Sequence, residues 1–227
     1  MNLNPNLELT PLLKQRYEIM RLVATGVVDE GIILKGGTGL LLCYGLDRFS
    51  DDMDFDPYSE KFNFERFQRT LEKILRDNGV PIERLNIKKD TNTTKRLMVK
   101  YTQVDTSYGD YPLKIEFSLR NTDKISDYDY HIVNGICVYK IEKLAMRKLD
   151  AFNHRTKNRD IYDMAFLVKN FPYVFNKEML QIVKSKDPES LLVEFETNKC
   201  DLVLSKVDGT KLILDMIDNI KKIEQGF

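Results

Sequence analysis

The 227-residue chain has few of the residues that mark disulfide-bonded or zinc-binding proteins. Its three cysteines, Cys43, Cys137 and Cys200, are far apart and odd in number. That pattern indicates free thiols in a reducing cytoplasm and not a disulfide framework or a zinc site. Only two histidines occur, His131 and His154, so we do not expect a histidine-based metal site.

Long apolar runs and an excess of either charge are also missing. No apolar run approaches the roughly 18 residues of a membrane span, and residues 1–11 lack the basic and apolar regions of a signal peptide. We therefore expect a cytoplasmic protein with no membrane partner. The 35 basic and 35 acidic side chains balance to zero net charge, which argues against a general RNA-binding protein and leaves only local basic patches.

Residues 32–34 are a short apolar stretch, which we expect to be a turn or a short strand. A glycine-rich turn follows it. The turn reads Lys35, Gly36, Gly37, Thr38. Glycines let the backbone approach a ligand without a Cβ in the way. A turn that opens onto a helix, here predicted over 38–45, presents backbone N–H groups to an anion such as phosphate. A lone Gly-Gly pair is more often simply a turn, so the phosphate-binding interpretation depends on a second motif.

The second motif is a pair of carboxylates, Asp52 and Asp54, in a strand-like segment. Residues two apart in a strand point to the same face, so the two carboxylates should project together while Met53 and Phe55 enter the core. Neighbouring carboxylates repel each other, and a divalent cation relieves the repulsion. Mg²⁺ (or Mn²⁺) suits such a site because it accepts one or two carboxylates and takes further oxygens from substrate phosphates. The two motifs together indicate metal-dependent phosphoryl or nucleotidyl transfer.

Arg48 and Ser50 precede the carboxylate pair, and each has two interpretations. Arg48 is either an ion-pair partner of a nearby aspartate or a group that orients the carboxylates, and both can hold. Ser50 is either a turn residue or a phosphate contact.

These motifs, with Lys148 and Arg159-Asp160-x-x-Asp163 further on, resemble the AbiEii-type nucleotidyltransferase toxins over roughly residues 30–168. The resemblance implies an α+β (mixed α/β) fold with a DNA-polymerase-β-like nucleotidyltransferase core. Thr38 stands where the superfamily usually has serine, which keeps the hydroxyl. The resemblance also implies a nucleoside triphosphate substrate, a toxin role in growth arrest or phage defence, and a cognate antitoxin. For some relatives the acceptor is a tRNA 3′ end.

A third carboxylate is expected from a neighbouring strand. Residues 113–119 alternate, with Leu113, Ile115, Phe117 and Leu119 inward and the polar residues outward. Glu116 is the candidate by position and by resemblance, as a base for the attacking hydroxyl or as part of a metal site. The alternative is an ordinary solvent-facing glutamate.

Lys148 lies inside the apolar stripe of a helix predicted over 141–156. It either extends to solvent or faces an anion, and the resemblance places a functional lysine here. Asn158 is a plausible N-cap for the next helix, which would put Asp160 and Asp163 on one face. Spacing does not decide which of these two is functional, and Asp160 also suits the helix dipole or a pair with Arg159 or Lys148.

The segment around these residues is basic and is a candidate track for RNA phosphates. Its basic side chains are Lys143, Arg147, Lys148, Arg155, Lys157 and Arg159, against a single acidic Asp150 up to that point. A solvated helix face and loop explain the same charges equally well.

The remaining pattern predicts packing elements. Helices are predicted over 9–29, over 62–78 and within 172–227. Two strands, 82–90 and 96–104, are predicted to form a hairpin around a turn at 91–94. We expect a loop over 121–135 and then a short strand from Ile136. The expected organisation is a nucleotidyltransferase core over 1–140 and a helical half over 141–227 that completes the site.

Three other functions remain open. An enzyme of the same fold could modify a protein or a small molecule, in keeping with the neutral net charge. A non-catalytic nucleotide-binding or partner-binding module would have no need of two adjacent carboxylates. A plain RNA-binding protein would show a basic surface with aromatic stacking residues, which the sequence lacks.

Overall fold

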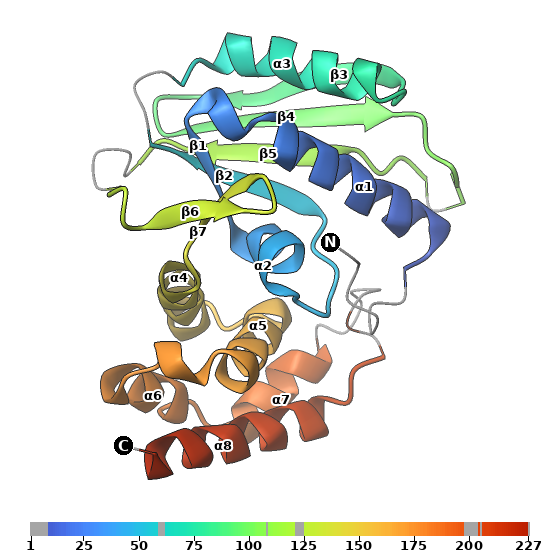
Figure 1. Ribbon diagram of the computed structural model, residues 1–227. Helices are drawn as coiled ribbons and strands as arrows, with labels where there is room; N and C mark the ends of the chain where they lie inside the picture. The colour runs from blue at the N-terminus through green and yellow to red at the C-terminus, as the bar shows by residue number, and fades with distance from the viewer. Residues whose placement is uncertain are drawn as a thin grey trace. The chain divides into compact units, whose positions relative to one another are not determined.

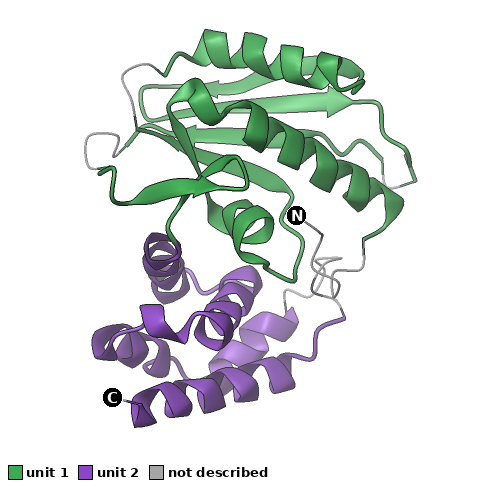
Figure 2. Ribbon diagram, in the orientation of Figure 1, with its two compact units in different colours: residues 1–140 green, residues 141–227 purple. Residues whose placement is uncertain are grey.

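The computed structural model describes residues 9–58, 62–107, 109–120, 125–197, 204 and 206–226. The chain divides into two compact units, residues 1–140 and residues 141–227 (Figure 2). Within the described residues no helix combines the length and the apolar character needed to cross a membrane.

Unit 1 is built on a mixed seven-stranded sheet with the strand order β3-β4-β5-β2-β1-β7-β6 (Figure 1). The strands are β1 (Ile32–Lys35), β2 (Asp52–Pro57), β3 (Ile82–Asp90), β4 (Thr94–Tyr101), β5 (Leu113–Ser118), β6 (Tyr130–Val133) and β7 (Ile136–Tyr139). Strand β2 runs parallel to β5 and β1 runs parallel to β7, whereas the other neighbours are antiparallel.

Three helices belong to unit 1: α1 (Pro11–Gly26), α2 (Gly36–Tyr44) and α3 (Phe64–Asp77). Helices α1 and α3 lie side by side across one face of the sheet (Figure 1). Their apolar residues pack on the inward side chains of β2, β4 and β5; for example, the Phe67 ring meets the Phe117 ring edge-on at a centroid distance of 4.7 Å. The outward side chains of the same strands are therefore left for the polar site.

Unit 2 consists of the helices α4 (Ile141–His154), α5 (Asn158–Asn170), α6 (Lys177–Lys184), α7 (Pro188–Thr197) and α8 (Gly209–Gln225). Helix α5 is central and packs against α4, α7 and α8. Nine of its residues are buried, including two aspartates, so a run that looks amphipathic in sequence is covered on most of its sides. The mixed α/β class with a helical C-terminal half is confirmed.

Several predicted boundaries were wrong. The loop predicted over 121–135 contains strand β6, and its residues 121–124 lie outside the described part. Asn134 and Gly135 have φ values of 51° and 80°, the left-handed pair of a two-residue hairpin turn. The Asn-Gly dipeptide was the signal that could have revealed this hairpin.

The N-cap of α5 is Lys157 and not Asn158. Asn158 is the first helical residue, and its side-chain oxygen accepts from the Arg159 N–H at 2.7 Å. Leu119 was predicted to point inward from a strand, but β5 ends at Ser118 and Leu119 is only half-buried. The hairpin strand predicted to reach 104 ends at Tyr101.

Candidate active site

The glycine pair forms the first turn of helix α2 and does not precede it. Gly36 has φ +71°, a left-handed conformation, and an added Cβ would lie 3.1 Å from the Asp54 Oδ2. A Cβ on Gly37 would lie 2.7 Å from the Ser50 Oγ and 3.0 Å from the Arg48 Nη2. The start of α2 is thus packed against Asp54, Ser50 and Arg48, which leaves no room for side chains at either glycine.

Thr38 connects α2 to the carboxylate strand. Its hydroxyl donates to the Asp52 carbonyl and lies 3.1 Å from the Ser50 Oγ. Thr38 is 1% exposed and Ser50 8%. Both hydroxyls therefore help to hold strand β2 against the helix, although a phosphate contact was one of the two interpretations of Ser50. Phosphate contacts from this turn would then come from its backbone.

Arg48 is buried beside this turn, and its Nη1 donates to the Phe49 carbonyl at 2.9 Å. Together with its approach to Gly37, this contact places the guanidinium under the start of α2. The structure is thus consistent with a positioning role for Arg48.

Asp52 and Asp54 project from the same side of β2, while Met53 and Phe55 are buried on the other. In the parallel pairing of β2 with β5, Asp52 lies opposite Lys114 and Asp54 lies opposite Glu116. The Lys114 ammonium forms an ion pair with the Asp52 Oδ2. The two strands therefore place three carboxylates and one lysine in two adjacent rows on one face of the sheet.

The charge of Asp54 is poorly compensated. Burial raises the pKa of its carboxyl, the nearby Lys35 and Lys114 lower it, and the carboxylates of Asp52 and Glu116 raise it further. The net direction is upward, so the ionised form is less favoured here than in water. Burial alone would lower the pKa of Lys114, but the ion pair with Asp52 and the charges of Asp54 and Glu116 raise it overall. A cation at Asp54 would relieve its unfavourable charge.

Lys35 was predicted to bind phosphate. It forms an ion pair with Asp56, which lies on the same side of β2 as Asp52 and Asp54. The Tyr139 hydroxyl donates to the same carboxylate at 2.8 Å. Asp56 is buried, so this pair joins β1, β2 and β7 inside the sheet and gives Lys35 a structural partner.

Glu116 is not an isolated solvent-facing glutamate. The Arg96 guanidinium contacts its Oε2 through Nε at 2.7 Å and through Nη2 at 2.6 Å. Arg96 lies directly opposite Glu116 on β4. The carboxylate is therefore held in one orientation beside Asp54.

The residues present fit a divalent cation that is shared with a substrate. Among the described residues no group of three or more histidine, cysteine, aspartate or glutamate side chains is arranged to hold a metal ion alone. Asp52 and Asp54 offer two hard oxygen donors on one face, and the raised pKa of Asp54 favours cation binding. Mg²⁺ commonly binds through one or two carboxylates and completes its shell with phosphate oxygens and water.

In unit 2, Lys148 of α4 forms an ion pair with Asp163 of α5 at 2.6 Å. The Asp163 side chain is fully buried, while that of Lys148 is 12% exposed. Of the two possibilities predicted for Lys148, the structure shows the one in which its ammonium faces an anion. The buried Asp163 carboxylate therefore restrains the position of the lysine ammonium.

Asp160 has different work. Its two oxygens accept from the Arg155 Nε and Nη2, each at 2.7 Å, and one also accepts from the Lys157 N–H at 3.2 Å. A buried carboxylate that is held in this way caps the start of α5. The two aspartates of this motif therefore have different partners: Asp160 binds Arg155 and the start of α5, and Asp163 binds Lys148.

The predicted basic track is less uniform than its sequence suggests. Arg155 is bound by Asp160, and Lys148 by Asp163. Lys143, Arg147, Lys148 and Arg159 are half-buried, whereas Arg155 and Lys157 are exposed. The segment is therefore an exposed surface only in part, and one of its two exposed cations is already ion-paired.

Sequence reasoning missed Lys114 and Arg96, which frame the carboxylates. The alternation of β5 placed Lys114 outward but did not reveal which strand lies beside it. The register with β2 and β4 was needed for that.

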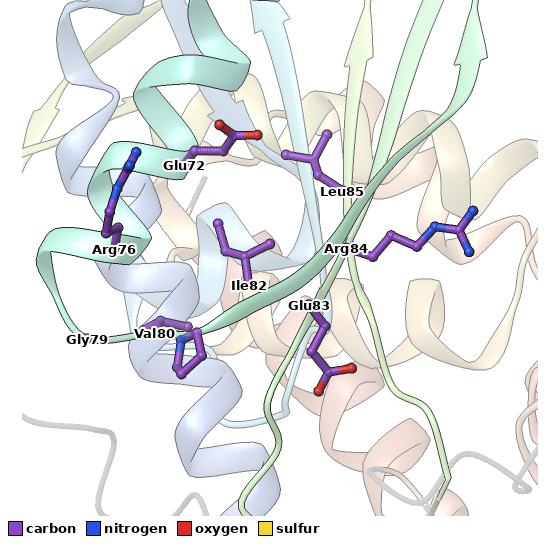
Figure 3. Close-up of a pocket in the computed structure, with 9 residues that line it drawn as sticks. Glu72, Arg76, Gly79, Val80, Ile82, Glu83, Arg84 and Leu85 are labelled. Atoms are coloured by element: carbon purple, nitrogen blue, oxygen red, sulfur yellow. The ribbon is translucent and has the colours of Figure 1, made fainter.

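Two hollows in the described surface lie away from these residues. One of about 540 Å³ lies where α3 ends and β3 begins and is lined by residues such as Arg76, Ile82 and Leu85 (Figure 3). Another of about 410 Å³ lies on the outward side of β3 and β4, with Arg84, Asn86 and Met98 in its wall. None of the predicted site residues lines either of them.

The chain is similar to proteins of known structure and to a curated relative. A crystal structure of JHP933 from Helicobacter pylori superposes with a TM-score of 0.85 at 30% identity, covering 96% of this chain and 94% of that one. Another H. pylori structure, provisionally described as a nucleotidyltransferase, gives a TM-score of 0.84 at 30% identity, covering 96% and 97%. An uncharacterised Aquifex aeolicus protein is 30% identical over 174 residues, which is 76% of this chain and 74% of the relative.

The model of the AbiEii nucleotidyl transferase toxins, of type IV toxin–antitoxin systems, matches residues 20–219. This range includes the carboxylate strands of unit 1 and the Lys148–Asp163 pair of unit 2. The chain belongs to the AbiEii nucleotidyltransferase toxin family.

Proposed function

We propose that the protein is a metal-dependent nucleotidyltransferase that moves a nucleoside monophosphate from its triphosphate to a cellular acceptor, with a tRNA 3′ end as the first acceptor to test. One observation carries the proposal: Asp52 and Asp54 share a face of β2, beside Glu116 and against the first turn of α2. Family membership supports the reaction class. The acceptor and the metal are part of the proposal.

The chain's own groups divide the work of binding. Backbone N–H groups of Gly36, Gly37 and Thr38 would hold the triphosphate, because the first N–H groups of a helix have no acceptor within it. Asp52 and Asp54 would hold Mg²⁺, which when bound would supply positive charge for the phosphates. Lys114, now paired with Asp52, would add a second positive charge beside this group of carboxylates.

The reaction is an in-line displacement. The acceptor hydroxyl oxygen forms a bond to the α-phosphorus, the bond from that phosphorus to the pyrophosphate oxygen breaks, and the hydroxyl proton passes to Glu116. Arg96 keeps the Glu116 carboxylate oriented for this transfer. We propose that Lys148, oriented by Asp163, supplies a positive charge for a substrate phosphate. Most of the rate would come from positioning and charge stabilisation.

In the cell, we propose that this activity makes the protein the toxin of a toxin–antitoxin pair that limits growth or phage propagation, neutralised by a cognate antitoxin. Induced expression of the wild-type chain should then arrest growth, and Asp54→Asn should not. Growth arrest by both would separate toxicity from nucleotidyl transfer.

The direct test is a labelling assay. The pure protein is incubated with Mg²⁺, each α-labelled nucleoside triphosphate in turn and a cell extract, and RNA is then separated from protein. Asp54→Asn is the inactive variant; Asp90→Asn, which removes a carboxylate at the exposed end of β3, is the matched control. We expect label on a small RNA with the wild type and with Asp90→Asn only.

Other outcomes lead elsewhere. Label on protein would keep the chemistry and change the acceptor class, an alternative that the zero net charge favours. No transfer of label with any nucleotide would contradict the catalytic proposal and favour a nucleotide-binding or partner-binding module.

A further inference from the structure

Arg16 of helix α1 is a buried cation far in sequence from every motif discussed above. It is 1% exposed and is among the largest fully buried side chains of the described part. Removing a guanidinium from water costs several kcal/mol unless its donors are matched. Among the described residues no ion pair involves Arg16. Its positive charge is therefore compensated by neutral groups, which the fold must position close to the guanidinium.

Those neutral groups are three backbone carbonyls and a phenol. Nη1 donates to the carbonyls of Asp51, at 3.3 Å, and Pro112, at 3.2 Å, and Nη2 donates to the Tyr111 carbonyl. Nε donates to the Tyr101 hydroxyl at 2.6 Å. The guanidinium carbon also lies 4.2 Å from the centre of the Tyr111 ring. The planar fork thus uses its donors at its edge and its face against an aromatic ring.

A second link closes the arrangement. The Tyr111 hydroxyl donates to the Asp51 Oδ2 at 2.9 Å. Asp51 is therefore held through its backbone by Arg16 and through its side chain by Tyr111, which Arg16 holds in turn. We call this set, Arg16, Asp51 and Tyr111–Pro112, the strand-start clamp.

The clamp lies at the starts of the two strands that carry the site carboxylates. Asp51 immediately precedes Asp52 at the start of β2, and Tyr111–Pro112 immediately precede β5, which carries Lys114 and Glu116. These parallel strands have no direct connection at this end, and their register sets Asp52 opposite Lys114 and Asp54 opposite Glu116. The clamp joins their starts one residue before the first carboxylate.

From this geometry we propose that Arg16 is a positioning residue for nucleotidyl transfer: it sets the relative placement of the β2 and β5 carboxylates. The inference rests on the proposed function. Lysine could not replace arginine, because a single ammonium cannot reach three carbonyls on two segments while it also lies flat on the Tyr111 ring. Helix α1, whose sequence pattern indicated only packing, then has a part in the chemistry.

The test compares Arg16→Lys with a neighbour on the same helix. The Gln15 side chain donates to the Thr102 carbonyl and accepts from the Val104 N–H, each at 3.0 Å, so Gln15→Ala breaks comparable hydrogen bonds beyond the end of β4 without touching Asp51 or Tyr111. Tm, kcat, the KM for the nucleoside triphosphate, and the Mg²⁺ concentration for half-maximal rate are measured for each, at a temperature where all are folded.

We expect Arg16→Lys to lower kcat by about 10- to 100-fold, since displacements of about 1 Å cost that much. The KM for the triphosphate should change by less than about threefold, and the Mg²⁺ requirement should rise. Gln15→Ala should lower Tm with kcat unchanged. Tyr111→Phe should share the effect of Arg16→Lys, and the double variant should be less than additive because both act through Asp51. Equal kcat losses in Arg16→Lys and Gln15→Ala, or full kcat in Arg16→Lys, would overturn the proposal.

Hydrogen exchange separates this inference from the proposed function, because it needs no activity. Arg16→Lys should speed amide exchange in peptides covering 51–57 and 111–118 and leave 130–139 unchanged. Unchanged exchange in the first two peptides would remove the clamp whatever the enzyme does. Faster exchange in a protein whose wild type transfers nothing would leave a structural clamp, and the positioning role would fail together with the proposed function.

Discussion

At the scale of single residues, the site combines a carboxylate with an unfavourable charge and a glycine in a conformation that few other residues adopt. Asp54 is ionised less readily than an ordinary aspartate, and Gly36 adopts a left-handed conformation beside it, which costs a glycine little. Groups with shifted pKa values concentrate where a protein binds or transforms something. Both residues lead to measurable consequences.

Asp54→Asn should stabilise the metal-free protein, and more so at pH 8 than at pH 5. Burial raises the pKa of Asp54 in the folded state, so the folded protein holds this proton more tightly than the unfolded chain. Wild-type stability is therefore lost as pH rises from the ordinary aspartate pKa through the raised one, and asparagine removes that loss. Urea unfolding in EDTA at both pH values measures the difference; a stabilisation that is larger at pH 5 would contradict the assigned direction.

Mg²⁺ should reverse this order. An ion bound by Asp52 and Asp54 stabilises the folded state of the wild type through mass action, and Asp54→Asn loses that gain. Thermal unfolding with and without Mg²⁺ checks it, with Asp90→Asn as the control that should respond like the wild type.

Gly36→Ala should abolish most transfer at a small cost in stability. A left-handed conformation costs a residue with a Cβ about 1–2 kcal/mol, and the new methyl would also press on the Asp54 Oδ2. Gly45 is the matched control, because its φ is +75° but an added Cβ meets nothing within 4 Å. Chemical unfolding should show similar losses for Gly36→Ala and Gly45→Ala, whereas the labelling assay should distinguish them. Equal activity in the two variants would mean that the approach to Asp54 is unimportant.

At the scale of elements, helix α5 of unit 2 contains two aspartates that look alike in sequence. Asp160 caps α5 and binds Arg155, while Asp163 faces Lys148. The same helix thus carries one carboxylate for its own start and another for a neighbouring lysine. The two roles predict different losses.

Asp160→Asn should lower the free energy of unfolding by about 1–3 kcal/mol, through the lost cap and charge-assisted bonds, and leave kcat within a few-fold for the folded enzyme. Asp163→Asn should lower kcat by at least about 10-fold even where the protein is fully folded, because Lys148 loses its orientation. Circular dichroism melts and transfer kinetics on both variants test this; a kcat loss confined to Asp160→Asn would exchange the two assignments.

At the scale of the whole molecule, 35 basic and 35 acidic side chains balance to zero, so an RNA acceptor would have to be held by few charges. The exposed members of the predicted basic track are Arg155 and Lys157, and Arg155 is already paired with Asp160. Recognition of the acceptor should then depend on shape and base contacts more than on the phosphate backbone.

RNA binding should accordingly show a shallow salt dependence. With about three phosphate contacts, the slope of log K against log salt should be near −2, from roughly 0.7 per contact on a single strand. Fluorescence anisotropy with a labelled RNA measures it, and Lys157→Glu should weaken binding more than Lys88→Glu on the β3 strand. A larger effect at Lys88 would move the acceptor track to the outward side of the β3–β4 hairpin.

Local pattern determined much of this protein. Alternation alone placed Asp52 and Asp54 on one side of a strand and Met53 and Phe55 on the other, because the two faces of a strand differ in exposure. The helix predicted over 9–29 is α1 (Pro11–Gly26), with Thr10 as its N-cap. The order of the motifs was enough to identify the family, since it needs no knowledge of contacts.

Tertiary structure decided the rest, because strand register, burial and ion pairing depend on residues far apart in the chain. The pairing of β2 with β5 brought Lys114 and Glu116 beside the carboxylates. Ion-pair geometry separated Asp160 from Asp163, which spacing alone could not do. The sequence did not indicate a role for Arg16, because its partners include the backbone carbonyls at positions 51, 111 and 112. Every residue has a backbone carbonyl, so the residue types at these positions do not reveal the contacts.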